Sequence, residues 1–277
     1  MTVGEIKAGS WTFTCRTAGD EGGRVVFLLH GFPQTSYSFR SQLDALAGAG
    51  YHAVAPDQRG YSPGARPVEV DAYRIDHLGS DVVALADSVG ASRFDLVGHD
   101  WGAAVAWYVA GRWPGRVRTL VPISVAHPSA FAAAYNGELG GNQKEMSGYM
   151  DFFRMEGGVA EDAMLPNLAG MYAELGEDAA AEYVRVIGER AALTAGLNYY
   201  RANKIEDLGV PPIEVPTMHI WSDGDAFLGR EASEATGRWV TGDYRFDVIE
   251  GVDHWVPEKA AGRVNELLLS FFGEHAD

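Results

Sequence analysis

The sequence predicts an α/β fold built on a mostly parallel sheet. Short apolar runs alternate with a helical pattern in the first third of the chain, and strand patterns return near its carboxyl end. Strand, helix and strand in that order predict βαβ units, because parallel neighbours need a long crossover connection. Between these two parts, residues 129–210 show helical spacing without a convincing buried strand, which indicates a helical insertion.

Four strands are expected in the first third. The apolar runs at 25–29, 53–55 and 94–97 each end at Gly, Pro or a polar residue, as buried strands do. The segment 11–15 alternates instead, which predicts an exposed antiparallel edge strand. A helix is expected before Gly90, because Ile75, Leu78, Val82, Leu85 and Val89 recur at spacings of three and four.

The later part of the chain completes the expected core. Helical patterns run through 179–192 and 193–202, strand patterns through 217–221 and 244–249, and a last helix through 259–272. We therefore predict a core domain made of residues 1–128 and 211–277. A helical cap, residues 129–210, enters it after the sixth strand.

Composition limits the function classes. The 277 residues include 22 Lys and Arg against 38 Asp and Glu, a net charge of −16. That charge repels nucleic acid and anionic membranes. One cysteine, Cys15, can form neither an intrachain disulfide nor a Cys-rich zinc site. No secretion signal or membrane-spanning pattern is recognised, so we expect a cytoplasmic protein.

The segment from Gly98 to Gly102 is the most informative for chemistry. It follows a strand and precedes a helix, and glycines flank its central Asp100, the arrangement called a nucleophile elbow. An aspartate is already anionic at neutral pH. It suits displacement at a saturated carbon, which gives an alkyl ester of Asp100. The simpler alternative is that Asp100 only caps the following helix.

His254 is the expected base for hydrolysis of that ester. It lies after the last strand, and the chain order of nucleophile, acid and histidine fits this architecture. The rival histidines are interpreted as structural: His30 opens a turn, His99 precedes the nucleophile and should point away from the site, and His219 lies inside a strand.

The acid that orients His254 is expected in the loop after residues 217–221. Asp225 is preferred because it lies deeper in the loop, and Asp223 remains the alternative. On the opposite side, the turn from His30 to Pro33 follows the first core strand. The backbone amides of Phe32 and Trp101 are expected to form the oxyanion hole for ester hydrolysis.

These residues resemble the α/β-hydrolases of the epoxide hydrolase and haloalkane dehalogenase group. The resemblance covers nearly the whole chain. The motifs that carry it are His30-Gly31-Phe32-Pro33 with Tyr37-Ser38-Phe39-Arg40, Asp57-Gln58-Arg59-Gly60-Tyr61-Ser62, the elbow, and the late Asp225 and His254. It implies an α/β-hydrolase fold with a cap, and a reaction that uses an aspartate nucleophile.

The cap motifs favour the epoxide hydrolases, which use two cap tyrosines to donate hydrogen bonds to the epoxide oxygen. Residues 149–154 and 197–201 resemble the two motifs, and the resemblance assigns those roles to Tyr149 and Tyr200. Substrate contacts are expected from four aromatic side chains, those of Phe32, Trp101, Phe152 and Trp255.

Two positions depart from the family pattern. Gln34 stands where the family often has a glutamate that helps to hold the hydrolytic water, and Ser222 begins the acid loop where glycine is common. The amide of Gln34 can still accept a hydrogen bond, but it carries no charge.

The sequence thus predicts an epoxide hydrolase that converts a small apolar epoxide and water into a vicinal diol. Neither a cofactor nor a metal is expected, and the chain is expected to be a monomer or a homodimer. Two alternatives remain open. One is a haloalkane dehalogenase with the same nucleophile, in which Trp101 would bind the halide. The other is a ligand-binding pseudoenzyme on this fold.

Overall fold

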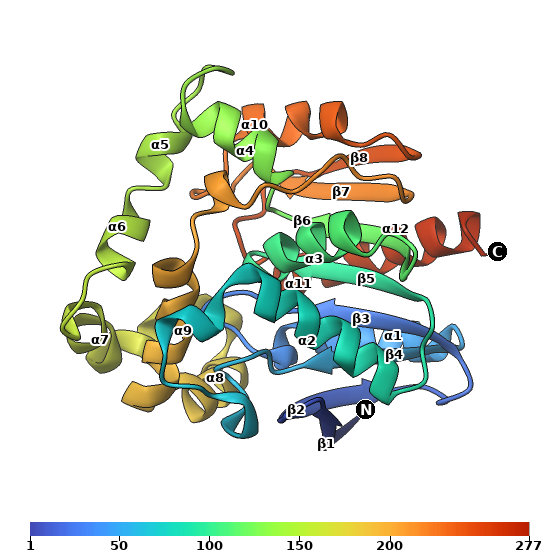
Figure 1. The fold of residues 1–277 in the computed structure, drawn as a ribbon, viewed down its shortest axis with the longest axis horizontal. Coiled ribbons are helices and arrows are strands. Elements are labelled where there is room, and N and C mark those ends of the chain that lie inside the picture. Colours follow the sequence, from blue (N-terminus) through green and yellow to red (C-terminus); the bar gives the residue numbers. More distant parts are fainter. Residues whose placement is uncertain (277) are drawn as a thin grey trace.

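A single eight-stranded sheet runs through the computed structural model, which describes residues 1–276 (Figure 1). The spatial order is β1-β2-β4-β3-β5-β6-β7-β8. The strands are β1 (Thr2–Ala8), β2 (Trp11–Ala18), β3 (Arg24–Leu29), β4 (Tyr51–Pro56), β5 (Phe94–His99), β6 (Val117–Ile123), β7 (Thr217–Ser222) and β8 (Tyr244–Ile249). From β4 to β8 all neighbours are parallel, which confirms the predicted fold class.

The first two strands are antiparallel, but the predicted edge strand was misplaced. β2 pairs with β1 along one side and with β4 along the other, so β1 forms the edge. Phe13 and Cys15 of β2 are buried. Most residues of β1 are exposed, so it contains no apolar run by which the sequence could reveal it.

Helices cover both faces of the sheet. Phe27 and Leu29 of β3 point to the face covered by α2 (Ile75–Ser88) and α3 (Trp101–Arg112). Val26 and Leu28 point to the other face, with α1 (Arg40–Gly48) and α12 (Ala261–Glu274). Successive strand residues point to opposite faces, so a fully apolar strand needs cover on both sides. The predicted helix before Gly90 is confirmed as α2.

Residues 129–210, between β6 and β7, contain helices and turns but no strand. The helices of this segment lie together at one end of the sheet, on the left of Figure 1. They are α4 (Pro128–Tyr135), α5 (Gln143–Met146), α6 (Tyr149–Phe153), α7 (Val159–Met164), a 3-10 segment (Leu165–Leu175), α8 (Glu177–Ile187) and α9 (Arg190–Ala202). The two predicted helices at 179–202 correspond to α8 and α9, and the break falls at Gly188. Two short helices in the last part of the chain complete the set, α10 (Arg230–Ala235) and α11 (Val256–Lys259).

The end of α9 is bonded to the backbone of the core. The Tyr199 hydroxyl donates to the carbonyl of Arg59 over 2.8 Å. The Asn203 amide accepts from the backbone N–H of Ile75 over 2.8 Å and donates to the carbonyl of Tyr73 over 2.9 Å. All three contacts are buried, so they fix α9 relative to the sheet.

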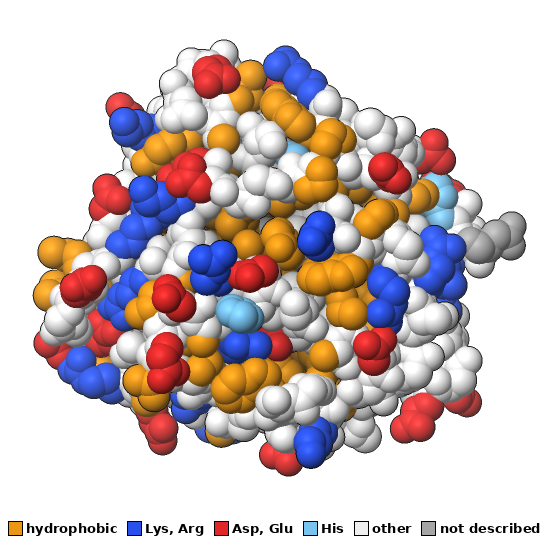
Figure 2. All heavy atoms as spheres, in the orientation of Figure 1, with side chains coloured by type: hydrophobic (Ala, Val, Ile, Leu, Met, Phe, Trp, Pro, Cys, Tyr) orange, Lys and Arg blue, Asp and Glu red, His pale blue; other side chains and the backbone are white. Residues whose placement is uncertain are grey.

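Basic and acidic side chains are mixed over the face seen in Figure 2, and the basic ones do not form one continuous patch there. Within residues 1–276, no helix combines the length and the apolar character that crossing a bilayer requires.

Phe94 tests the packing of the α2–α3 face. Its side chain is fully buried, and its ring meets that of Phe27 edge to face at 5.3 Å. We expect Phe94→Ala to lower the free energy of unfolding by about 3–5 kcal/mol, because it opens a cavity that rigid neighbours cannot fill. Urea unfolding followed by circular dichroism measures this. Val3→Ala, at an exposed position of β1, should change stability by less than about 0.5 kcal/mol.

Candidate active site

The turn between β5 and α3 presents Asp100 in a strained backbone conformation. Its φ of 53° and ψ of −124° lie where side chains other than glycine are rare. The flanking glycines make room for the turn. A Cβ on Gly98 would lie 2.2 Å from the carbonyl oxygen of Gly102, and a Cβ on Gly102 would lie 1.9 Å from that of Leu29. The elbow predicted from the sequence is therefore sterically required to have glycine on both sides.

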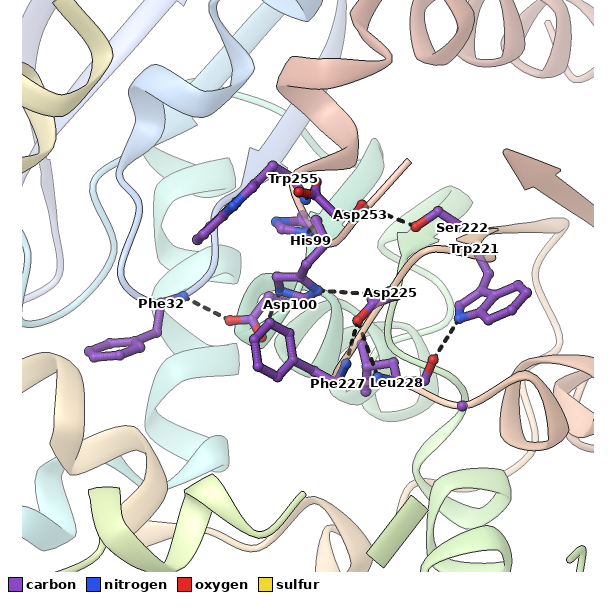
Figure 3. A network of polar contacts seen from close by, with 12 residues as sticks. Phe32, His99, Asp100, Trp221, Ser222, Asp225, Phe227, Leu228, Asp253 and Trp255 are labelled. Carbon is purple, nitrogen blue, oxygen red and sulfur yellow. Dashed lines mark hydrogen bonds and ion pairs between the residues drawn. The ribbon is translucent and has the colours of Figure 1, made fainter. Parts of the chain in front are cut away.

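The carboxylate of Asp100 does not cap α3, although the residue occupies the N-cap position. Its Oδ1 instead accepts a hydrogen bond from the backbone N–H of Phe32 over 2.8 Å (Figure 3). The backbone N–H of Trp101 also helps to lower the pKa of this carboxylate. Of the two amides expected from the sequence, that of Phe32 is hydrogen-bonded to Asp100.

His254 contacts the acid loop through the ring nitrogen Nδ1. Its Nδ1–H donates to Oδ2 of Asp225 over 2.8 Å. The second oxygen of Asp225 accepts backbone N–H bonds from Phe227 at 2.8 Å and Leu228 at 3.2 Å (Figure 3). These contacts hold the buried carboxylate in one orientation, and that orientation fixes the imidazole.

Asp223, the alternative acid, is turned away from the histidine. Its carboxylate accepts from the backbone N–H of Gly251 over 2.6 Å. Ser222, where glycine was expected, donates its hydroxyl to the carbonyl of Asp253 over 3.2 Å and closes the base of the loop. The structure thus brings Asp225, and not Asp223, to His254.

The electrostatics of the site come from one imidazole between two carboxylates. Nε2 of His254 lies 3.6 Å from Oδ2 of Asp100. Burial alone would lower the pKa of His254, but Asp225 and Asp100 outweigh it and raise that pKa to about 10. Burial alone would likewise raise the pKa of Asp100, and the hydrogen bond and charge of His254 hold it below its usual value. At neutral pH His254 is therefore an imidazolium and Asp100 is an anion.

The other histidines do not line the cavity, but the expectation for His99 was incomplete. Its Nε2–H donates to the backbone carbonyl of His254 over 2.8 Å, and the two rings lie 4.7 Å apart. Burial lowers the pKa of His99 to about 4, so it is neutral. His30 and His219 bond to backbone groups, as structural histidines do. No local pattern indicates that His99 supports the His254 loop, because this contact spans 155 positions along the chain.

A cavity of about 170 Å³ lies over Asp100 and His254. Its lining is almost entirely apolar and aromatic. The lining side chains are Phe32, Pro33, Asp100, Tyr149, Phe153, Met171, Tyr200, Phe227, His254 and Trp255. The sequence anticipated the part formed by Phe32, the two tyrosines and Trp255, but it missed Met171 and Phe227.

Two side chains that were expected to line the cavity, those of Phe152 and Trp101, are not part of its lining. Phe153 lines the cavity in place of Phe152, because residues four apart share one face of a helix and Phe153 follows Tyr149 by four along α6. The rings of Tyr149 and Phe153 meet at 5.3 Å. Trp101 is not among the lining side chains and packs edge to face against Tyr200 at 5.1 Å.

Tyr149 and Tyr200 face the carboxylate from two different helices, α6 and α9. Their ring centroids are 6.3 Å apart. Burial raises the pKa of both hydroxyls, and the negative charge of Asp100 raises each further. Both side chains are therefore protonated and able to donate hydrogen bonds. Within residues 1–276, the site included, no group of three or more His, Cys, Asp or Glu side chains is arranged to hold a metal ion.

Comparison with known proteins identifies the family. The family described as alpha/beta hydrolase fold matches residues 24–261. The chain belongs to the α/β-hydrolases. Within that family its relatives include Epoxide hydrolase A of Mycobacterium tuberculosis, 35% identical over 92% of both chains. Epoxide hydrolase B of the same organism is 37% identical over 92% of both chains. Human Epoxide hydrolase 4 is 30% identical over 97% of this chain and 78% of its own.

Solved structures agree with these relatives. The crystal structure of Epoxide Hydrolase A from Mycobacterium thermoresistibile superposes with a TM-score of 0.84 at 28% identity, covering 98% of this chain and 97% of the other. An epoxide hydrolase of Bacillus megaterium, in complex with an inhibitor, gives a TM-score of 0.84 at 26% identity, with 98% and 100% covered. The similarity spans the helical segment as well as the sheet.

Removing the charge of Asp100 tests the electrostatics of the site. We expect Asp100→Asn to lower the pKa of the His254 imidazole from about 10 toward its ordinary value of 6.5, since burial is then opposed by Asp225 alone. An NMR titration of the imidazole measures this. Asp223→Asn, in the acid loop but bonded only to Gly251, is the matched control and should leave the pKa unchanged. If the pKa of His254 is unaltered in Asp100→Asn, the charge of Asp100 does not raise the pKa of the imidazole, and the coupling described here is wrong.

Proposed function

We propose that this protein is an epoxide hydrolase that forms and then hydrolyses an ester on Asp100. One observation carries the proposal: an anionic carboxylate at the floor of an apolar cavity lies opposite two protonated tyrosines and beside an imidazole paired with a second carboxylate. The names of the relatives at 35% and 37% identity support the same reaction.

In the first step, Oδ2 of Asp100 attacks a ring carbon and the bond from that carbon to the epoxide oxygen breaks. Oδ1 is already held by the Phe32 amide, which leaves Oδ2 as the attacking atom. The electron pair of the broken bond moves to the epoxide oxygen, where Tyr149 and Tyr200 donate hydrogen bonds and one of them supplies a proton. That tyrosine recovers its proton through water from the His254 imidazolium, whose pKa falls once the charge of Asp100 is consumed, so His254 is neutral before the second step. The product is a hydroxyalkyl ester of Asp100.

In the second step, water attacks the carbonyl carbon of this ester. His254 accepts a proton from the water through Nε2, while Asp225 stabilises the resulting imidazolium. The carbonyl oxygen becomes negative and is bonded by the amides of Phe32 and Trp101. Collapse of this intermediate breaks the bond between the carbonyl carbon and the alkyl oxygen. The alkyl oxygen takes the remaining proton of the attacking water, which releases the diol, restores the carboxylate of Asp100 and leaves His254 protonated as at the start.

We further propose that residues 129–210 act as the cap domain of a core made of residues 1–128 and 211–277. The cap supplies both tyrosines, Phe153 and Met171 to the cavity. At about 170 Å³ the cavity is smaller than the roughly 300–1,000 Å³ typical of sites for drug-sized ligands. This favours a small, uncharged, apolar epoxide, such as one with a single aryl ring or a short alkyl chain.

Trapping the ester tests the reaction class. His254→Gln removes the base of the second step but keeps the Asp100 nucleophile, so we expect incubation with styrene oxide to add the mass of one substrate to the protein. Intact-protein mass spectrometry detects the adduct, and peptide mapping should locate it on Asp100. The double variant Asp100→Asn with His254→Gln is the control and should remain unmodified.

The same experiment separates the alternatives. A haloalkane dehalogenase would give an adduct with a haloalkane but not with the epoxide. A ligand-binding pseudoenzyme would give no adduct with either reagent, and that result would sink the proposal.

The tyrosines have their own test. We expect replacement of both Tyr149 and Tyr200 with Phe to lower kcat/KM for styrene oxide by at least about a hundredfold, because the epoxide oxygen then leaves without a donor. Steady-state kinetics measures this, with circular dichroism as the check on folding. Tyr199→Phe is the matched control, since its hydroxyl bonds to the Arg59 carbonyl and not to the cavity. Undiminished turnover in the double variant would show that Tyr149 and Tyr200 are not the donors to the epoxide oxygen.

A further inference from the structure

The acid loop from Asp225 to Gly229 belongs to neither a helix nor a strand, so its backbone groups need other partners. The N–H groups of Phe227 and Leu228 donate to the Asp225 carboxylate. The carbonyl of Leu228 accepts from the indole N–H of Trp221 over 2.9 Å (Figure 3). The carbonyl of Phe227 and the N–H of Gly229 are left, and both are bonded by a side chain from the helical segment 129–210.

That side chain is Gln143, the first residue of α5, which is 1% exposed. Its Nε2 donates to the carbonyl of Phe227 over 2.9 Å, and its Oε1 accepts from the N–H of Gly229 over 2.7 Å. Nε2 also donates to the hydroxyl of Ser147 over 2.9 Å, within the helical segment itself. One end of the amide can only donate and the other can only accept, so the loop fixes its orientation.

A single peptide group connects Gln143 with Asp225. The peptide between Phe227 and Leu228 accepts from Gln143 at its carbonyl and donates through its N–H to Oδ1 of Asp225 over 3.2 Å. A hydrogen bond to the carbonyl polarises the peptide group and strengthens its N–H as a donor. Oδ2 of the same carboxylate accepts from Nδ1–H of His254. A continuous series of hydrogen bonds therefore runs from the helical segment to the imidazole.

The helical segment also contacts this loop inside the cavity. The ring of Phe227 lies 5.3 Å from that of His254 and 5.2 Å from that of Tyr149, with both pairs edge to face. Tyr149 begins α6, the helix that follows α5. The stretch of chain that brings Tyr149 to the cavity thus also bonds to the backbone beside Asp225.

We propose that Gln143 is a positioning residue through which the helical segment holds the acid that orients His254. The inference rests on the proposed function, because that function gives Asp225 and His254 their parts in hydrolysis of the ester. Gln143 does not line the cavity and acts only through the loop. It holds the peptide after Phe227, this peptide holds Asp225, and Asp225 keeps Nε2 of His254 directed at the water that attacks the ester.

The two chemical steps should respond differently to loss of this amide. Gln143→Met keeps the length of the side chain but removes both contacts with the loop. We expect ester hydrolysis to slow by about fivefold to tenfold, the value of one hydrogen bond. Ring opening should change by less than about twofold, because Asp100 is held by Phe32 from a different loop. Rapid-quench mass spectrometry with styrene oxide measures both rates.

A second readout needs no substrate. Asp225 is the group that raises the pKa of His254 most, so a less firmly held Asp225 should raise it less. We expect Gln143→Met to lower the pKa of His254 by about 0.5–1, again the value of one hydrogen bond. An NMR titration of the imidazole in the free protein measures this.

Two more variants separate positioning from general stability. In Gln143→Asn the amide is one methylene shorter and cannot reach Phe227 and Gly229 together. It should show both changes to a smaller extent, and it decides the question if Gln143→Met does not fold. Ser147→Ala is the matched control, because it removes the third contact of the same amide and leaves both bonds to the loop. It should leave the ratio of the two rates and the pKa of His254 unchanged.

The outcomes distinguish this inference from the proposed function. Normal hydrolysis of the ester, or an unchanged pKa of His254, in folded Gln143→Met overturns the role of Gln143. Equal slowing of both steps also overturns it, since that indicates a general distortion of the site. If no epoxide forms an ester in any variant, His254→Gln included, the proposed function fails, and the pKa of His254 still reports whether Gln143 acts on Asp225.

Discussion

One imidazole held between two carboxylates is the interaction on which the rest of the site depends. His254 is kept protonated by Asp225 and Asp100 together, and its charge in return keeps Asp100 anionic although it is buried. In the proposed reaction, the first step changes the charges around His254. Formation of the ester consumes the negative charge of Asp100, so one of the two groups that raise the pKa of His254 disappears when the imidazole must become a base. The two steps are thus coupled through a single charge.

The fold prepares this arrangement at the ends of parallel strands. The glycines at 98 and 102 allow the strained turn that exposes Asp100, the loop after β3 brings the Phe32 amide to one oxygen, and the loop after β7 brings Asp225 to the histidine. Each of these loops follows the carboxyl end of a strand in one sheet, so the sheet sets their relative positions. The helical segment then closes an apolar space over the carboxylate and brings in the two tyrosines.

Local patterns predicted most of the strands and the elbow around Asp100, whereas the two tyrosines were assigned only by resemblance to a family. Strands buried on both faces leave continuous apolar runs, which is why β3, β5 and β7 were recognised, whereas exposed β1 was not. Two carboxylates in one loop could be separated only by side-chain direction, which selects Asp225 over Asp223. Phe152 was chosen over Phe153 because the rotational position of a five-residue helix is not encoded in its own sequence. The contact of His99 with the His254 carbonyl joins distant segments, so no local pattern reports it.

The hydrogen bonds at the end of α9 tie one wall of the cavity to the core. Tyr200 follows a residue that is bonded to the core backbone, and Asn203 adds two more such bonds, so movement of α9 away from the sheet would break all three. Tyr149 and Phe153 instead belong to the short α6, which is preceded by Gly148 and followed by Gly157 and Gly158. One wall of the cavity is thus tied to the core backbone, and the wall on α6 is bonded to it, because the guanidinium of Arg154 donates to the carbonyl of Tyr200 over 3.2 Å. A shift of α9 would therefore move the side chains of both walls together.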